Sequence, residues 1–217
     1  MLFPLETWGK VFHVGLTQKV EVGSDESNLI RIVSGEENVT VSFNPAIESP
    51  VTLARGEGFE FVAPAGVHFS ITASGPIMVG KFMVGQSYWT DSTDAMGDPA
   101  FGLVVPTAQY RSDYTFTTPD TMTVNYVNVI AEIPTSGADY ITLDGQALTW
   151  SQFEPIGNSS YGVARVNITT SGSGGSHSIY SSSSALTFGI EVYGFANFTS
   201  FLYAGGLDLN YINPVGK

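Results

Sequence analysis

The sequence predicts an all-β protein built from two consecutive, similar β-sandwich units that arose by internal duplication. Short apolar runs alternate with turn residues roughly every ten positions, which is typical of a sandwich or a barrel. Helical periodicity is nearly absent, since the one tempting window, residues 94–103, contains the helix breakers Gly97, Pro99 and Gly102. Matches at constant spacing between the two halves indicate the duplication.

The first half contains short strand-like runs separated by polar or glycine-containing turns. In one of them Val39, Val41 and Phe43 alternate with polar residues, so these side chains share one face of a strand. Gly80 lies inside the last run, where glycine indicates a bulge or a close approach of backbone. The expected strands are Lys10–Leu16, Lys19–Val22, Asn28–Ser34, Asn38–Asn44, Val51–Leu53, Gly58–Val62, Val67–Ala73 and Ile77–Val84.

The stretch Gly97–Glu132 opens the second half with a turn, a short apolar run and a series of alternating aromatic residues. Further on, Asp144-Gly145 predicts a hairpin turn, because both residues tolerate positive φ. The expected strands are Gly102–Val105, Val124–Ile130, Tyr140–Leu143, Ala147–Phe153, Tyr161–Thr169, His177–Tyr180, Leu186–Phe195 and Leu207–Ile212.

Three sets of residues recur in the second half, each set with one constant spacing, and changes of spacing between sets fall in turns, where insertions cost little. Residues 1–90 are therefore expected to form the first sandwich unit and residues 97–213 the second. The matched sets are Pro4, Trp8 and Phe12 with Pro106, Tyr110 and Tyr114; Asn28–Val33 with Asn125–Ile130; and His68, Gly80 and Gly85 with His177, Gly189 and Gly194.

Charge and composition exclude several classes of function. The net charge is −12, and the eight Lys and Arg residues are scattered, whereas nucleic acids and anionic membranes need a clustered basic face. The chain has no cysteine, so it forms no disulfide and has no thiolate site. It also has neither an apolar run long enough to insert into a membrane nor a signal peptide at its start. We expect a mature piece of a longer secreted protein.

Catalytic motifs are missing, and we predict that the protein is not an enzyme. The histidines His13, His68 and His177 show no metal-ligand spacing, and two of them match between the halves, which favours a structural role. The serine-rich loops contain no nucleophile motif. A pair of carboxylates for glycoside hydrolysis remains an alternative, because such pairs need not be close in sequence.

One acidic and aromatic loop between the halves is the candidate ligand-binding site. It contains Tyr88, Trp89, Asp91, Asp94 and Asp98. Its carboxylates suit Ca²⁺, a hard cation that prefers oxygen ligands, but their spacing matches no known calcium loop. A solvated acidic linker without a bound ion is the alternative interpretation of these residues. No cofactor other than this Ca²⁺ is expected, and no other metal site.

Four Asn-x-Ser/Thr sequons are candidate glycosylation sites, which would fit a secreted glycoprotein. They begin at Asn38, Asn158, Asn167 and Asn197.

The order of turn glycines and core aromatics resembles the N-terminal domain of IgGFc-binding proteins. The resemblance covers nearly all of the chain and speaks for fold more than for activity. The residues that carry it are Gly97-Asp98-Pro99, Pro106, Tyr110, Tyr114, Phe116, Asn128–Ala131, Leu143-Asp144-Gly145, Gly157, Tyr161, His177, Phe188-Gly189, Tyr193-Gly194 and Tyr203–Leu207.

The resemblance implies a secreted, β-rich, non-catalytic module of the kind found in mucus-associated and adhesion proteins. Unlike many such proteins the chain lacks cysteine. We expect that it starts partway into the family's domain. Antibody binding is not transferred, because the matching positions are structural.

The sequence thus predicts a secreted or cell-surface module for recognition, adhesion or matrix scaffolding. Its expected partners are extracellular proteins or glycans, with self-association as a further expectation. Two alternatives remain open, a structural subunit of a filament or fibre and a calcium-dependent carbohydrate-binding domain.

Overall fold

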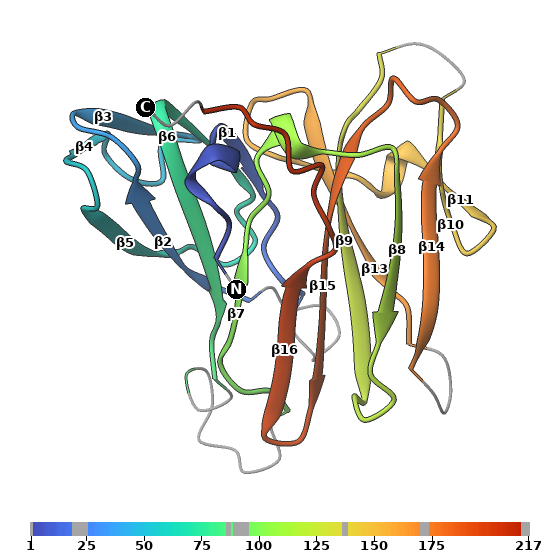
Figure 1. Ribbon diagram of the computed structural model, residues 1–217. Coiled ribbons are helices and arrows are strands. Elements are labelled where there is room, and N and C mark those ends of the chain that lie inside the picture. Colours follow the sequence, from blue (N-terminus) through green and yellow to red (C-terminus); the bar gives the residue numbers. More distant parts are fainter. Residues whose placement is uncertain are drawn as a thin grey trace.

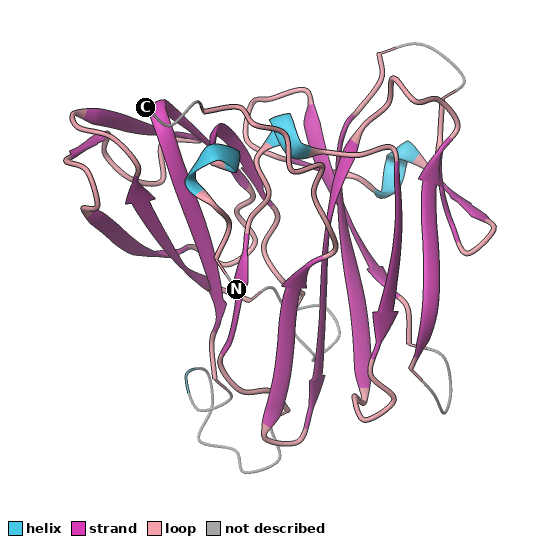
Figure 2. Cartoon of the chain, in the orientation of Figure 1, coloured by secondary structure: helices cyan, strands magenta, loops and turns pink. Residues whose placement is uncertain are grey.

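The computed structural model describes residues 2–18, 26–85, 88, 96–135, 139–169 and 174–213. It is all-β, as the sequence predicts: antiparallel strands dominate and the helical elements drawn in Figure 2 are short. Three of these are single 3₁₀ turns, η1 (Leu5–Thr7), η3 (Thr107–Gln109) and η4 (Trp150–Gln152).

The strands fall into two groups that lie side by side in Figure 1. The first group contains β1 (Gly9–Val14), β2 (Asn28–Ser34), β3 (Val39–Asn44), β4 (Val51–Leu53), β5 (Gly58–Ala63), β6 (Phe69–Met83) and β7 (Ala100–Leu103). The second contains β8 (Asp113–Thr118), β9 (Val124–Glu132), β10 (Ile141–Leu143), β11 (Gln146–Leu148), β12 (Glu154–Pro155), β13 (Tyr161–Asn167), β14 (Gly175–Ser181), β15 (Phe188–Ala196) and β16 (Thr199–Ala204).

The long strand β6 joins both layers of the first group. Its first part, Phe69–Ala73, pairs with β1 and β3, and its second part, Ile77–Met83, pairs with β2 and β7. Two separate strands were expected here. The structure joins the two expected strands into the single strand β6, which changes partners near Pro76. Pro76 has no N–H to donate, and its carbonyl accepts a bond from the Gly35 N–H.

Both groups enclose an apolar core, and they repeat one strand order. In the first, β4-β3-β6-β1 faces β5-β2-β6-β7; in the second, β11-β10-β14-β8 faces β13-β9-β15-β16, with β12 added at the β13 edge. Each strand position in the first group therefore has a counterpart in the second, which supports the inferred duplication. The boundaries at residues 1–90 and 97–213 stay a prediction, and β7 pairs with β6 of the first group.

The 3₁₀ turns that precede β1 and β8 also correspond. Pro4 and Pro106 open them with φ/ψ of −65°/147° and −68°/151°, and Trp8 and Tyr110 close them at −68°/141° and −67°/149°. In each turn the closing N–H donates to the first carbonyl of the turn at 3.1 Å. The two turns therefore have the same backbone conformation at positions that the constant spacing in the sequence predicts to be equivalent.

Strand register refines the proposed histidine match. Val14 pairs with Phe69 in the first group and Phe116 pairs with His177 in the second. Since Val14 and Phe116 occupy equivalent core positions, Phe69 rather than His68 is the counterpart of His177.

Two expected strands are absent from the described structure. Ala147–Phe153 contains only the end of β11 before η4 begins. Leu207–Ile212 is an irregular tail with no strand partner, because its backbone bonds the 3₁₀ segments instead: Asp208 N–H donates to Gln109 O at 3.1 Å, and Ile212 N–H to Glu6 O at 2.9 Å.

The second group packs on the first through the outer face of β13-β9-β15-β16. Val163 and Leu202 on that face lie directly over Gly15 and Gly102, where an added Cβ would come within 2.7 Å of each side chain. Tyr126, Tyr193 and Phe195 form a buried cluster with Met83 of β6 on the same side; their side chains therefore fill the joint between the groups.

Candidate functional site: an open sheet face

The outer face of β5-β2-β6-β7 carries a row of apolar side chains that no other part of the described chain covers. Val62, Leu29, Phe82 and Phe101 are direct neighbours across the four strands. Val62 and Phe101 are 42% and 43% exposed, and Leu29 and Phe82 are half-buried. We call these four residues the apolar row. Contiguous exposed apolar surface of this kind marks interaction sites more often than isolated apolar residues do.

A charged pair borders the apolar row. Arg31 on β2 donates from Nε to Glu60 on β5 at 2.7 Å, and both side chains are largely exposed. The guanidinium carbon also lies 5.5 Å above the centre of the Phe82 ring, a cation–π distance. The face therefore combines an apolar strip with a polar rim, the usual composition of a protein-binding surface.

Phe101 packs against Phe82 and Gly80. Its ring centre lies 4.6 Å from that of Phe82, and its ring covers Gly80, where a Cβ would come within 2.7 Å. Gly80, which was expected to mark a close approach of backbone, instead leaves room for the aromatic ring of Phe101. Gly189 is covered in the same way by the ring of Tyr110.

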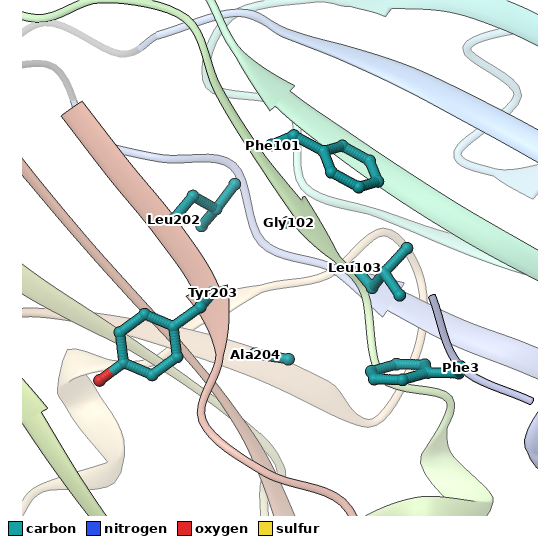
Figure 3. Close-up of a pocket in the computed structure, with 7 residues that line it drawn as sticks. All are labelled: Phe3, Phe101, Gly102, Leu103, Leu202, Tyr203 and Ala204. Carbon is teal, nitrogen blue, oxygen red and sulfur yellow. The ribbon is translucent and has the colours of Figure 1, made fainter. Parts of the chain in front are cut away.

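A shallow groove continues from Phe101 between β7 and β16. Figure 3 shows Leu202 pointing toward Gly102, with Phe3 and Leu103 closing the groove below. Its volume is about 240 Å³, and its lining is mostly apolar. Tyr203 points away from β7 in this view. The groove extends the apolar row to the joint between the two groups.

The three histidines are buried and participate in packing. His13 stacks on Tyr161 with ring centres 3.9 Å apart, and one ring nitrogen bonds the Ser70 hydroxyl at 2.8 Å. Burial lowers the pKa of His13 to about 4, while the Glu132 carboxylate acts in the opposite direction. His68 accepts a bond from the Leu16 N–H at 3.1 Å.

His177 lies in a hydrogen-bonded chain that the sequence did not reveal. Its Nδ1 lies 2.7 Å from Asp144 Oδ2, and its Nε2 lies 3.1 Å from the hydroxyl of Thr118. Carboxylate, imidazole and hydroxyl in this order resemble a nucleophile arrangement. However, Thr118 and His177 are buried, and the Thr118 hydroxyl accepts a bond from the Gly175 N–H. These hydrogen bonds connect β8, β14 and the β10–β11 turn.

A model of the IgGFc binding protein family matches residues 1–194 of the sequence. The chain belongs to this family. The IgGFc-binding family comprises extracellular, non-enzymatic binding modules. No helix in the described part of the chain is long and apolar enough to cross a membrane.

The remaining comparisons add nothing to the assignment to the IgGFc-binding family. Curated proteins give no match. A solved structure described as an anti-sigma factor domain-containing protein is 8% identical over 84% of this chain and 78% of its own, with a TM-score of 0.20. That likeness is too low to support any argument.

The predicted ligand site falls largely outside the described residues, which exclude Trp89, Asp91 and Asp94. Tyr88 is exposed, and its N–H donates to Gly85 O at 3.0 Å. Asp98 is exposed beside β16, where its N–H donates to the Ser200 hydroxyl at 2.9 Å. Among the described residues no three acidic, histidine or cysteine side chains cluster as metal ligands. A calcium site in this loop stays a prediction.

All four sequon asparagines are exposed, in agreement with accessible acceptor sites. Asn38 and Asn158 lie in turns, Asn167 ends β13, and Asn197 lies in the β15–β16 turn. Whether they carry glycans stays a prediction.

The apolar row was not predicted as a site, although its signal is present in the sequence. The run Asn28–Ser34 is apolar on both faces except at Arg31, which is unusual for a strand with one solvated face. Its meaning depends on which strands lie beside it, and those pairings join residues far apart in the chain.

Proposed function

We propose that this protein is a non-catalytic extracellular recognition module that binds the surface of another protein through the apolar row and the adjoining groove. The supporting observation is the open apolar face on β5-β2-β6-β7. Family membership supports an extracellular binding role, and the polar rim of Arg31 and Glu60 supports a protein rather than a lipid partner.

The chemistry of the face favours proteins over glycans. Sugar-binding sites need several convergent polar groups beside an aromatic ring, whereas the apolar row offers aliphatic and aromatic contacts with only one charged pair at its border. Aromatic residues and arginine are the side chains that dominate protein–protein binding energies. Phe82, Phe101 and Arg31 fit that role.

A binding screen tests the proposal. The purified protein is presented to immobilised matrix proteins, mucins and a glycan array, with and without a calcium chelator. We expect binding to at least one of these proteins, and we expect this binding to persist when calcium is removed by the chelator. A Val62→Asp, Phe101→Ser double variant should weaken this binding by about tenfold or more, because it places charge and a gap in the centre of the row.

The matched control is Tyr180→Ser, which removes an aromatic residue of similar exposure (47%) from β14 in the second group. It should bind like the natural protein. Circular dichroism and melting temperature establish that each variant is folded. A partner whose binding ignores the row variants, or binding to glycans alone that calcium removal abolishes, would contradict the proposal.

A further inference from the structure

Three polar side chains meet in the buried joint between the two groups of strands. Lys81 comes from β6, Asn128 from β9 and Glu191 from β15, and the last two are direct cross-strand neighbours. Lys81 and Asn128 are 0% exposed and Glu191 is 3% exposed. Burying a charge costs free energy unless the charge is closely paired, so a fully buried lysine in this joint calls for an explanation.

The amine and the amide are held next to each other by shared acceptors. Lys81 Nζ donates to Glu191 Oε2 at 2.5 Å and to Gly15 O at 2.7 Å. Asn128 Nδ2 donates to the same two oxygens at 3.5 and 3.3 Å, and also to Leu16 O at 3.3 Å. A potential nucleophile and a carboxamide thus lie side by side with a carboxylate touching both.

A fourth side chain polarises the amide. The Tyr193 hydroxyl donates to Asn128 Oδ1 at 3.1 Å and accepts a bond from the Gln18 N–H at 2.9 Å. Tyr193 is fully buried, and burial raises the pKa of its hydroxyl, so it stays a proton donor. A simple ion pair between Lys81 and Glu191 requires neither Asn128 nor this donor.

We propose that Lys81 and Asn128 join in an intramolecular isopeptide bond, with Glu191 transferring the protons. Glu191 takes a proton from the Lys81 ammonium group, and the free Nζ attacks Cγ of Asn128 to form a new carbon–nitrogen bond. The carbonyl oxygen gains negative charge, which the Tyr193 O–H stabilises.

Collapse of this intermediate completes the reaction. The proton on the attacking nitrogen passes to Nδ2 through Glu191, the Cγ–Nδ2 bond breaks, and ammonia leaves. The ammonia takes the proton held by Glu191 and departs as ammonium, which restores the carboxylate. One ammonium group and one carboxamide become one secondary amide and one ammonium ion, with no oxidation or reduction.

Placement of the reacting groups favours the step. Fixing two groups in contact replaces an encounter in solution by a reaction within one molecule, and exclusion of water protects the product from hydrolysis. The bond would connect β6 of the first group to β9 of the second. In a chain without cysteine it would supply the covalent fastening that disulfides give to other extracellular domains.

Mass spectrometry of the full chain tests the proposal independently of any binding partner. The intact natural protein should be lighter than its sequence by the mass of one ammonia molecule. Proteolysis should release a branched peptide that contains both Lys81 and Asn128. In a denaturing gel the linked chain should migrate faster than an unlinked variant, because its closed loop cannot fully extend.

Variants assign the roles. Lys81→Met and Glu191→Gln should have the full mass of their sequences, whereas Lys10→Met, at an exposed lysine on β1, should keep the ammonia loss. If the first two variants fold poorly, the peptide map of the natural protein decides alone. A natural protein at full sequence mass, an ammonia loss at another asparagine, or a water loss that joins Lys81 to Glu191 would each overturn the assignment.

Discussion

Each group of strands has two layers around an apolar core, and we call the groups the first and the second sandwich. The outer face of β13-β9-β15-β16 in the second sandwich packs against the first sandwich. The corresponding face of the first sandwich, β5-β2-β6-β7, is open to solvent. The two sandwiches share their strand order, so the difference lies in the side chains. The covered face presents Asn128, Glu191 and Tyr193, which bond across the joint. The open face presents the apolar row and one exposed ion pair.

The same strand order thus presents one covered face and one open face. The covered face makes its contacts within the chain, and the corresponding face of the first sandwich is the one that we propose as a binding surface. Three changes, in order of decreasing expected effect, test how far the two sandwiches depend on their joint and on their own internal contacts.

Gly157→Ala should disrupt the joint most strongly. Gly157 has a φ of +56°, its N–H donates to His68 O, and an added Cβ would lie 2.2 Å from the Asn44 carbonyl oxygen in the other sandwich. Backbone strain and overpacking together should cost about 3 kcal/mol or more of unfolding free energy. Urea denaturation measures the loss.

Gly145→Ala is the matched control. Gly145 also has positive φ, +80°, but an added Cβ meets no atom within 4 Å. It should cost only about 1 kcal/mol, the backbone strain by itself. Equal losses for the two variants would show that the contact with Asn44 contributes nothing.

The buried His13 should make the joint sensitive to acid. Its pKa is about 4 in the folded protein, below the ordinary value of about 6.5, so the unfolded chain binds a proton first as the pH falls. The stability that His13 contributes is complete above pH 6.5 and is lost between pH 6.5 and 4, by up to about 3 kcal/mol.

Melting temperatures of the natural protein and of His13→Gln, measured from pH 7 to pH 4, check this expectation. The variant should lose less stability over that range, because glutamine takes up no proton. Titration of carboxylates that do not interact with His13 affects both proteins alike and cancels in the difference. Parallel curves would mean that His13 stays accessible to protons in the folded state.

Asp144→Asn should give the smallest change, confined to the second sandwich. Asparagine keeps the tolerance for the φ of +49° at this position but loses the carboxylate that faces His177 and accepts the Ser178 N–H at 2.9 Å. We expect a loss of about 1 kcal/mol in thermal or urea unfolding. Asp113→Asn, in an exposed pair with Arg111, should change stability by less than about 0.5 kcal/mol. A larger loss for Asp113→Asn than for Asp144→Asn would show that the hydrogen bond between Asp144 and His177 does not stabilise the second sandwich.

Local sequence patterns predicted the β class and most strands because alternation and turn residues act over a few positions. Val39, Val41 and Phe43 alternate as expected, and Asp144-Gly145 forms the expected turn with positive φ at both residues. The tail was mispredicted, since its apolar alternation resembles a strand while its backbone partners are the 3₁₀ turns.

The functional features depend on contacts between distant segments and could not be predicted in this way. Leu29, Val62 and Phe101 become neighbours only through strand pairing. Lys81 and Glu191 meet only when the two sandwiches dock. The spacing of the sets that begin at Pro4 and Asn28 did reach across the chain, and it agrees with the shared strand order, whereas the set that contains His68 is shifted in register.

The long strand β6 has a consequence for how the protein acquires its structure. Because β6 bonds β1, β2, β3 and β7, neither layer of the first sandwich can complete its hydrogen bonds before β6 is in place. We expect that sandwich to form in one cooperative, slow step, as non-local strand pairing requires. In the second sandwich β14 and β15 are separate strands, so one layer can assemble ahead of the other and offer a surface on which the remainder nucleates.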